Sequence, residues 1–259
     1  MDFRGVVVDL DGTVYQGNTL IPGVSDAIER LREQGLSVLF LTNNPTQTRE
    51  TYAERLTTMG VRVGPEELLS AGTVTARYLA TNHATDQVFV IGSSGLCEQL
   101  KDNNVKLTDE PDAADVVVTS YDYSFGYEDL ANGLWALDGA ASFVATDPDI
   151  VYPNDDGRPM PGSGAITNAV AGVAGREPDV VLGKPAPETI EVVLETLEYQ
   201  PEDYLVVGDK IDTDIAFGER AGMTTALVRS GLANGTGPET ASPPPDHVID
   251  TLADITSIL

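Results

Sequence analysis

Short β-branched runs alternate with amphipathic stretches along the whole chain, and this alternation constrains the fold more than any other feature of the sequence. The apolar runs have the length and residue types of strands, and they lie at 6–9, 37–41, 87–91, 115–119, 142–145, 180–182, 204–207 and 224–228. Helical patterns, with apolar residues three or four positions apart, include 24–34, 46–59 and 188–197. Strands that alternate with helices build βα units, so the sequence predicts an α/β fold with a doubly wound, mainly parallel sheet.

The middle of the chain has strands and helices of its own and many turn signals, such as Asp155-Asp156-Gly157 and Pro161-Gly162-Ser163-Gly164. We therefore expect two domains: a discontinuous core of residues 1–81 and 178–259, and a second domain inserted at 82–177. A Gly-, Pro- and Ser-rich stretch at 235–245 predicts a loop before a last short strand and helix.

Acidic residues outnumber basic ones by 41 to 15, which gives a formal net charge of -26. Such a surface repels nucleic acid and anionic lipid, so neither is expected as a partner. The sequence has no secretory signal, no apolar run near the ~18 residues of a membrane span and only one cysteine, Cys97, and these features predict a cytoplasmic protein. Charges of one sign on such a surface repel one another in dilute buffer. At 1 M salt the screening length falls to ~3 Å and most of this repulsion is lost, so we expect a protein from a salt-loving source.

The segment Asp9-Leu10-Asp11-Gly12-Thr13 follows directly after an apolar run, where ligands of open α/β sheets gather. There Asp9 is placed to attack phosphorus and form an aspartyl phosphate. Asp11, on the same side of an extended segment, is placed to protonate the leaving alcohol and then to activate water. A hairpin turn at Asp11-Gly12 is the competing interpretation. A calcium-binding loop is excluded, because its twelfth position is Leu20 instead of glutamate.

The segment Thr42-Asn43-Asn44 lies between a predicted strand and a predicted helix. Hydroxyl and amide groups at a helix N-terminus bind anions, so Thr42 and Asn43 are candidates for phosphate contact. The alternative is that these residues only cap the helix.

Lys184, in Gly183-Lys184-Pro185, follows another predicted strand and is one of only four lysines in the chain. A rigidly held ammonium group would neutralise phosphate oxygens as charge builds in the transition state. The segment is not a P-loop, because Pro185 occupies the Ser/Thr position.

Asp209 and Asp214 lie on either side of a turn that leads from a predicted strand into a helix. Carboxylate oxygens are ligands that Mg²⁺ prefers. The alternative is that the acidic residues here, with Asp212 or Thr213 as the cap, only stabilise the helix N-terminus.

All four segments follow predicted strands, so one fold would bring them to the same edge of a sheet. Several carboxylates that must also admit a phosphate dianion require a cation, because two like charges at 4 Å repel by ~4 kcal/mol at an effective dielectric constant of 20. A divalent metal together with Lys184 would balance this charge.

In this order the four segments resemble the motifs of the haloacid dehalogenase-like (HAD) superfamily, and the long insert resembles its NagD-type, 4-nitrophenylphosphatase-like branch. The resemblance implies a Rossmann-like core with an inserted α/β cap of the C2 type, and a Mg²⁺-dependent phosphatase for small phosphate monoesters. It implies that Asp9 is the nucleophile and Asp11 the general acid/base. Mg²⁺ would be held by the Asp9 carboxylate, the Asp11 backbone carbonyl and Asp209, with Asp214 acting directly or through water. The phosphoryl group would be held by Thr42, Asn43 and Lys184.

Several alternatives stay open from the sequence. A phosphomutase or phosphotransferase of the same superfamily and a non-catalytic sensor of phosphate esters share these motifs, whereas a dinucleotide-dependent oxidoreductase is disfavoured because no G-x-G-x-x-G follows the first strand. Sugar phosphates, glycerol phosphate, phosphoglycolate, nucleoside monophosphates and 4-nitrophenyl phosphate are all candidate substrates. Asp147 replaces the Asn that is usual in the branch. Caps of this kind often mediate homodimers, so a homodimer is a candidate assembly. The cap residues that are candidates for substrate contact are Tyr121, Asp122, Tyr123, Thr146, Asp147 and Tyr152.

Overall fold

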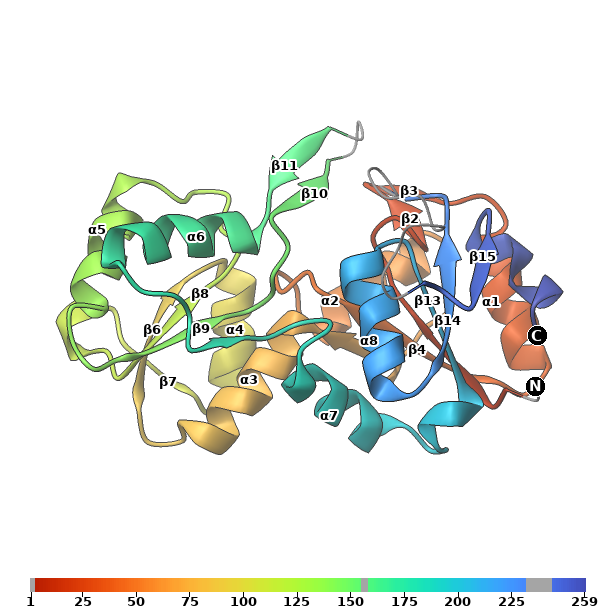
Figure 1. Ribbon diagram of the computed structural model, residues 1–259, viewed down its shortest axis with the longest axis horizontal. Helices are drawn as coiled ribbons and strands as arrows, with labels where there is room; N and C mark the ends of the chain where they lie inside the picture. Colours follow the sequence, from red (N-terminus) through yellow and green to blue (C-terminus); the bar gives the residue numbers. More distant parts are fainter. Residues whose placement is uncertain (1–2, 155–157, 232–243) are drawn as a thin grey trace.

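Two α/β bodies lie side by side in the computed structural model, which describes residues 3–154, 158–231 and 244–259 (Figure 1). Both ends of the described chain lie in the same body, and the chain crosses into the other body and returns. This arrangement and the two separate sheets confirm the predicted fold class. The exact division at residues 81/82 and 177/178 stays a prediction. No helix of the described residues is long and apolar enough to cross a membrane.

The first body is built on a six-stranded sheet in which every neighbouring pair is parallel. Its strands, in spatial order, are β15 (His247–Ile249), β14 (Thr224–Val228), β13 (Tyr204–Gly208), β1 (Gly5–Val8), β4 (Ser37–Thr42) and β5 (Leu68–Ser70). The helices around this sheet are α1 (Val24–Glu33), α2 (Arg49–Thr58), α3 (Ala71–Asn82), α7 (Pro187–Thr196) and α8 (Ala216–Ala221).

Alternating side chains of the central strands pack on opposite faces of this sheet. Val6 and Val8 of β1 join the cluster formed with α1 and α2, whereas Val7 joins the cluster formed with α3, α7 and α8. Both faces are therefore covered by helices, as a doubly wound sheet requires.

The second body is built on a five-stranded parallel sheet. Its strands, in spatial order, are β12 (Val180–Val181), β9 (Ser142–Ala145), β8 (Val116–Thr119), β6 (Gln87–Ile91) and β7 (Lys106–Leu107). Its helices are α4 (Ser94–Asp102), α5 (Tyr127–Ala136) and α6 (Ser163–Ala174). Helices α5 and α6 pack on one face, and the other face shares an apolar cluster with α3, α7 and the first body. This continuous core joins the two bodies.

Two short hairpins form two-stranded sheets separate from the two main sheets. They are β2 (Tyr15–Gln16) with β3 (Thr19–Leu20), and β10 (Val151–Pro153) with β11 (Pro159–Pro161). The first hairpin reverses at Gly17-Asn18, and Asp11-Gly12 lies in a separate turn just before it. The hairpin turn at Asp11-Gly12, the competing interpretation of this dipeptide, therefore does not form there.

Several predicted elements differ in the structure. The strand before Lys184, β12, pairs with β9 in the second sheet, so the prediction that one sheet carries all four motif segments is wrong for this strand. Helix α2 begins at Arg49 and not near residue 46, because Thr48 provides its N-cap. Residues 211–215 form a π-helical turn before α8. Most of the loop predicted at 235–245 and the turn at 155–157 lie outside the described residues.

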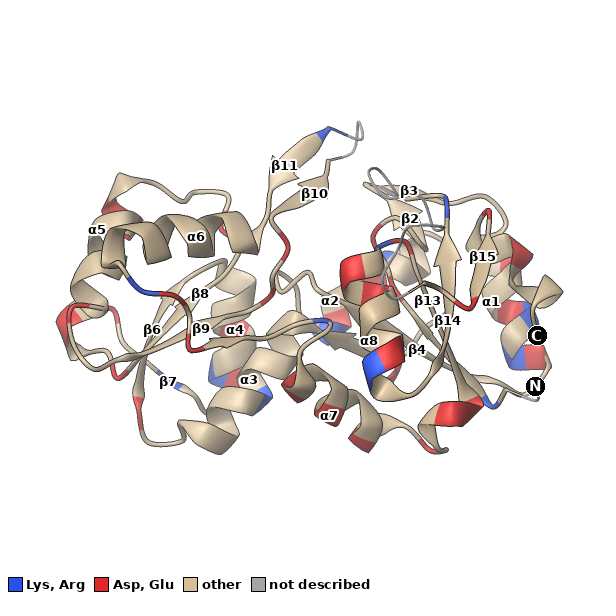
Figure 2. Cartoon of the chain, in the orientation of Figure 1, with Lys and Arg blue, Asp and Glu red and all other residues tan. Residues whose placement is uncertain are grey.

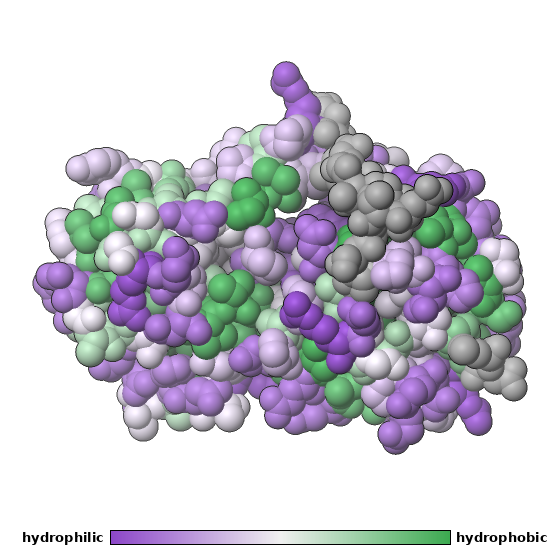
Figure 3. Space-filling view, viewed as in Figure 1, coloured by the Kyte–Doolittle hydropathy of each residue, from purple (hydrophilic) through white to green (hydrophobic). Residues whose placement is uncertain are grey.

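Acidic residues are spread over both bodies (Figure 2). Hydrophilic residues likewise occur across the visible face of both, with hydrophobic residues in smaller separate patches (Figure 3). The negative charge is therefore a property of the whole surface and does not come from one acidic segment.

Candidate active site

A cavity of about 240 Å³ lies where the two bodies meet. Strands β1, β4 and β13 of the first body end at this cavity, and the segments after β8 and β9 reach it from the second. All the site residues named from the sequence line it: Asp9, Asp11, Thr42, Asn43, Lys184, Asp209 and Asp214. The four motif segments thus converge even though one of their strands belongs to the other sheet.

Asp9 is the first residue after β1 and is almost fully buried. Its N–H donates to the carbonyl of Val207 at 2.9 Å, which continues the pairing of β1 with β13 and fixes the direction of the side chain. The Thr13 hydroxyl donates to Oδ2 of Asp9 at 3.3 Å. One carboxylate oxygen is therefore oriented by the turn that follows the strand.

Lys184 is buried among acceptors, with a side chain only 2% exposed. Its Nζ donates to Oδ1 of Asp9 and to Oδ1 of Asp214, each at 2.6 Å, and to the carbonyl of Leu41 at 2.9 Å. Burial lowers the pKa of Lys184, but attraction by Asp214 and Asp9 outweighs this effect and raises the pKa above its ordinary value. Lys184 is therefore a fixed positive charge beside the candidate nucleophile.

The Asn43 side chain holds the backbone of Lys184. Its Oδ1 accepts from the Lys184 N–H at 2.6 Å, and its Nδ2 donates to the Lys184 carbonyl at 3.2 Å. The Thr42 hydroxyl accepts from the N–H of Asn44 at 3.1 Å. Capping of α2 by Thr42 or Asn43 is excluded, because the side chain of Thr48 accepts from Thr51 and caps that helix.

Asp11 is held by an aromatic side chain that sequence analysis did not single out. The Tyr15 hydroxyl donates to Oδ2 of Asp11 at 3.1 Å, and the guanidinium of Arg55 lies 4.3 Å from the centre of the Tyr15 ring. Burial raises the pKa of Asp11 despite the opposing effects of Arg55 and Tyr15. A carboxyl with a raised pKa is suited to donate a proton near neutral pH.

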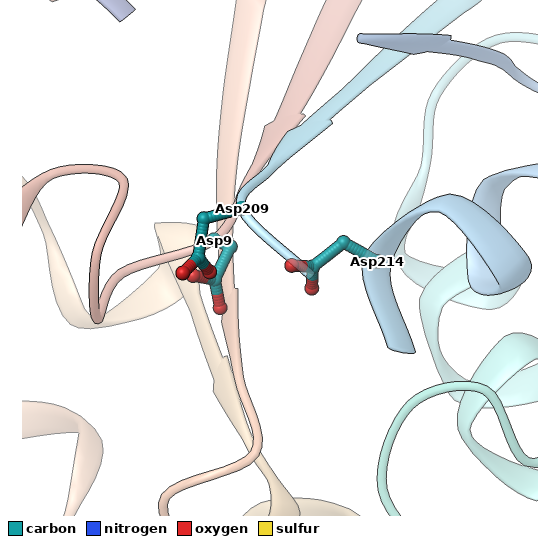
Figure 4. A group of neighbouring side chains, drawn as sticks. All are labelled: Asp9, Asp209 and Asp214. Atoms are coloured by element: carbon teal, nitrogen blue, oxygen red, sulfur yellow. The ribbon is translucent and has the colours of Figure 1, made fainter. Parts of the chain in front are cut away.

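Three buried carboxylates converge at the ends of the core strands. Asp9, Asp209 and Asp214 each offer one oxygen, and these oxygens all lie within 4.8 Å of one another. Figure 4 shows Asp9 and Asp209 at neighbouring strand ends, with Asp214 approaching from the following helical turn. Oδ2 of Asp214 also accepts from the N–H of Lys210 at 3.0 Å, whereas neither Asp212 nor Thr213 makes a side-chain cap for the π-helical turn or for α8.

The electrostatics of this cluster suit a divalent cation. Burial, assisted by Asp214 and Asp209, raises the pKa of Asp9 well above its ordinary value, and Lys184 only partly opposes the rise. A cation held by the same carboxylates would lower that pKa, because opposite charge favours the ionised form. Gly12 lies against Asp209 with φ +88°, and a Cβ there would meet Oδ2 of Asp209 at 2.5 Å. The close packing keeps the aspartate in place.

Comparisons with known proteins agree with this geometry. The model of the haloacid dehalogenase-like hydrolases matches residues 6–106, and a HAD-hydrolase-like model matches residues 181–255. The chain is 33% identical to the sugar-phosphatase AraL of Bacillus subtilis, over 98% of this chain and 92% of the relative. It is 32% identical to the 5'-nucleotidase YutF of the same organism, over 97% of each protein.

Solved structures with similar folds cover nearly the whole chain. A p-nitrophenyl phosphatase from Archaeoglobus fulgidus superposes with a TM-score of 0.89 at 34% identity and covers 100% of both chains. NagD from E. coli K-12 superposes with a TM-score of 0.85 at 27% identity, over 98% of both.

The chain belongs to the haloacid dehalogenase-like hydrolases. The predicted family and its NagD-type, 4-nitrophenylphosphatase-like branch are confirmed by these matches, which include both bodies. The second body is accordingly the C2-type cap of this HAD hydrolase.

The cap of this HAD hydrolase contacts the core through an ion pair at the cavity. Nζ of Lys210, next to Asp209, lies 3.0 Å from Oδ2 of Asp149, which follows β9. Tyr121 and Tyr152 share a hydrogen bond of 2.9 Å between their hydroxyls and also line the cavity. Of the cap candidates named above, Tyr121, Tyr152 and Asp147 line the cavity, whereas Asp122, Tyr123 and Thr146 are not among the lining residues.

Sequence reasoning did not assign roles to Lys210, Asp149, Tyr15 or Arg55. Lys210 is the second lysine within a motif segment, and this position was the signal for its role. Arg55 had no local signal, because it acts through its contact with Tyr15, 40 positions earlier in the chain. Tyr15 lies only four residues after Asp11, and its contact with that residue depends on the turn between them.

Proposed function

We propose that this HAD hydrolase is a Mg²⁺-dependent phosphatase that cleaves small phosphate monoesters through an aspartyl phosphate on Asp9. The observation that carries the proposal is the position of Asp9, which lies in the cavity where the two bodies meet, with Nζ of Lys184 at 2.6 Å and the carboxylates of Asp209 and Asp214 close by. Three of the relatives described above are named as phosphatases or as a nucleotidase, which agrees with this class of reaction.

In the first step an Asp9 carboxylate oxygen attacks phosphorus while the bond from phosphorus to the ester oxygen breaks. The leaving alkoxide takes a proton from the carboxyl of Asp11, whose pKa is raised by burial. The hydrogen bond from Tyr15 holds Asp11 in one orientation during this transfer. The products of the step are a free alcohol and phosphorylated Asp9.

In the second step Asp11, now ionised, accepts a proton from a water molecule that attacks the phosphorus of the intermediate. The bond between phosphorus and the Asp9 oxygen breaks, and inorganic phosphate leaves. The Asp9 carboxylate is regenerated and Asp11 is protonated again, so the site returns to its starting state.

Lys184 and Thr42 would contact the transferring phosphoryl group. The ammonium group of Lys184 is held in place by Asp9, Asp214 and the Leu41 carbonyl, so it needs no rearrangement as negative charge develops. Asn43 acts on the same group indirectly, because its amide fixes the Lys184 backbone.

The carboxylates of Asp9, Asp209 and Asp214 would hold Mg²⁺, with the Asp11 backbone carbonyl as a further ligand and Asp214 contacting the ion directly or through water. Their oxygen chemistry and mutual approach within 4.8 Å suit this ion. When bound, the metal supplies the positive charge that allows a phosphate dianion to approach a cluster of carboxylates.

The direct test is hydrolysis of 4-nitrophenyl phosphate by the purified protein with Mg²⁺ in molar KCl. We expect turnover that EDTA abolishes, with one phosphate released into water for each ester consumed. A phosphomutase or phosphotransferase would release less phosphate than the ester it consumes. A non-catalytic sensor would bind the ester without turnover.

The aspartyl-phosphate mechanism is tested with Asp9→Asn. We expect a loss of at least about 10³-fold in kcat, because the nucleophile is removed while binding is retained. Asp26→Asn, an exposed aspartate on α1, is the control and is expected to leave kcat unchanged. Retention of activity by Asp9→Asn would exclude the mechanism.

A further inference from the structure

The cavity carries an excess of negative charge that the reaction itself does not need. Its described lining residues include six aspartates and two lysines but no arginine. Lys184 is paired with Asp9 and Asp214, and Lys210 is paired with Asp149. Among the described lining residues, the ammonium group of each lysine is therefore already paired with a carboxylate. The charges of bound Mg²⁺ and of the phosphoryl group would offset each other around Asp9.

Asp147 is the buried carboxyl of this cavity that the proposed mechanism does not use. It lies two residues after β9 and is 2% exposed. Its Oδ2 accepts from the Thr146 hydroxyl at 2.9 Å, and its Oδ1 accepts from the N–H of Asp149 at 3.1 Å. These donors hold the carboxyl in one orientation on the cap side of the cavity.

The cap side of the cavity is where the alcohol part of the ester must lie, because the phosphoryl group is taken by the core residues around Asp9. A fixed carboxylate there accepts hydrogen bonds from hydroxyl groups. The same carboxylate repels a second anionic group on the substrate, and the repulsion is strong because the group is shielded from bulk water. Lys210 does not offset this effect, since Asp149 already neutralises it.

The cavity is also small. Its volume of about 240 Å³ is below the ~300–1,000 Å³ that is usual for ligand pockets. A compact alcohol therefore fits better than a nucleoside. The hydroxyls of Tyr121 and Tyr152 line the same region and add polar groups that can pair with a hydroxylated ligand.

We propose that Asp147 is a specificity-determining residue, which selects phosphate esters of compact, uncharged, hydroxyl-bearing alcohols and rejects esters whose leaving group carries a second negative charge. This inference rests on the proposed phosphatase function. It concerns the choice of substrate and leaves the chemistry at Asp9 unchanged.

The test uses two substrates that differ in one group. Glycerol 3-phosphate and 3-phosphoglycerate share a three-carbon chain, and a CH₂OH group in the first is replaced by a carboxylate in the second. 4-Nitrophenyl phosphate, which has neither group, is the reference. Burial and the neighbouring Asp149 raise the pKa of Asp147 to about 7, so the assays are run at pH 8, where this residue is mainly ionised, and at one fixed salt concentration.

For the unchanged protein we expect kcat/KM to be at least about tenfold higher for glycerol 3-phosphate than for 3-phosphoglycerate. In Asp147→Asn this ratio should fall at least about fivefold, mainly through faster turnover of 3-phosphoglycerate, while kcat/KM for 4-nitrophenyl phosphate changes less than about threefold. Asp138→Asn removes one exposed charge from the cap surface and should leave the ratio unchanged.

Equal kcat/KM for the two three-carbon esters in the unchanged protein would overturn the inference, and this comparison does not depend on any variant folding. A uniform change for all three esters in Asp147→Asn would overturn it as well, because a merely structural role would act on every substrate. If none of the esters, including 4-nitrophenyl phosphate, is hydrolysed, the phosphatase function itself fails and this inference fails with it.

Discussion

The side-chain amide of Asn43 forms two hydrogen bonds with the backbone of Lys184, a residue 141 positions further along the chain. The pair joins the loop after β4 in the core sheet to the segment after β12 in the cap sheet. The ammonium group beside Asp9 is thus positioned by a contact between the two sheets.

We expect Asn43→Ala to lower kcat more than it raises KM, because Lys184 would no longer be held beside Asp9. The loss of a partner for the buried Lys184 N–H should also lower the free energy of unfolding by about 1–3 kcal/mol. Steady-state kinetics and denaturant unfolding measure both effects. Asn82→Ala removes an exposed side-chain hydrogen bond on α3 and is the matched control. Unchanged kcat in Asn43→Ala would contradict the positioning role.

Removal of the Asp11 carboxyl should affect esters according to their leaving groups. We expect Asp11→Asn to slow release of alcohol from glycerol 3-phosphate by about 10²–10⁴-fold, because an alkoxide must be protonated as it leaves. Nitrophenolate is a weak base and leaves without a proton, so 4-nitrophenyl phosphate should still give a rapid burst before a slow steady state. Stopped-flow absorbance and single-turnover assays measure these phases. Equal losses for both esters would argue against Asp11 as the general acid.

Mg²⁺ should stabilise the protein in the absence of substrate. Mg²⁺ at ~100 times its Kd raises the free energy of unfolding by about 2.7 kcal/mol, which corresponds to a rise in Tm of several degrees for a chain of this size. We expect Asp209→Asn to abolish the rise and Asp212→Asn, an exposed change in the same segment, to retain it. Thermal unfolding with and without Mg²⁺ makes the comparison, and a full shift in Asp209→Asn would place the metal elsewhere.

The stability of the protein should depend on pH through Asp147. Burial and Asp149 raise the pKa of this carboxyl from 3.8 to about 7, so folding favours its protonated form. The resulting stabilisation is complete below pH 4 and is lost as the pH rises through 7. From pH 5 to pH 8 the free energy of unfolding of the unchanged protein should therefore fall by about 2–3 kcal/mol relative to that of Asp147→Asn. Denaturant unfolding at both pH values measures this difference. The free energy of unfolding of Asp138→Asn should change with pH as that of the unchanged protein does.

Salt should increase stability, because the net charge of -26 is spread over both bodies. We expect Tm to rise from 0.1 to 2 M KCl, since the screening length falls to about 3 Å or less at molar salt. Neutralising three exposed aspartates of the cap, Asp102, Asp112 and Asp138, with Asn should weaken this dependence. Equal stability and activity at low and molar salt would contradict the expected origin in a salt-loving organism.

The sequence by itself determined the α/β class and which residues meet at the candidate site. Asp9, Thr42 and Asp209 each stand at or just after the end of a buried strand, and the strand pattern is local, so it can be read from residue spacing. Parallel strands then place these residues at one edge of a sheet, whatever the details of packing.

Only the tertiary structure decided how the site is held together and what faces the substrate. The strand before Lys184 joins the cap sheet, Tyr15 holds Asp11, and Lys210 of the core pairs with Asp149 of the cap. The contacts that join core to cap link residues far apart in sequence, as Asn43 and Lys184 are. Their partners are set by how two sheets pack against a shared apolar core, which no local pattern of residues encodes.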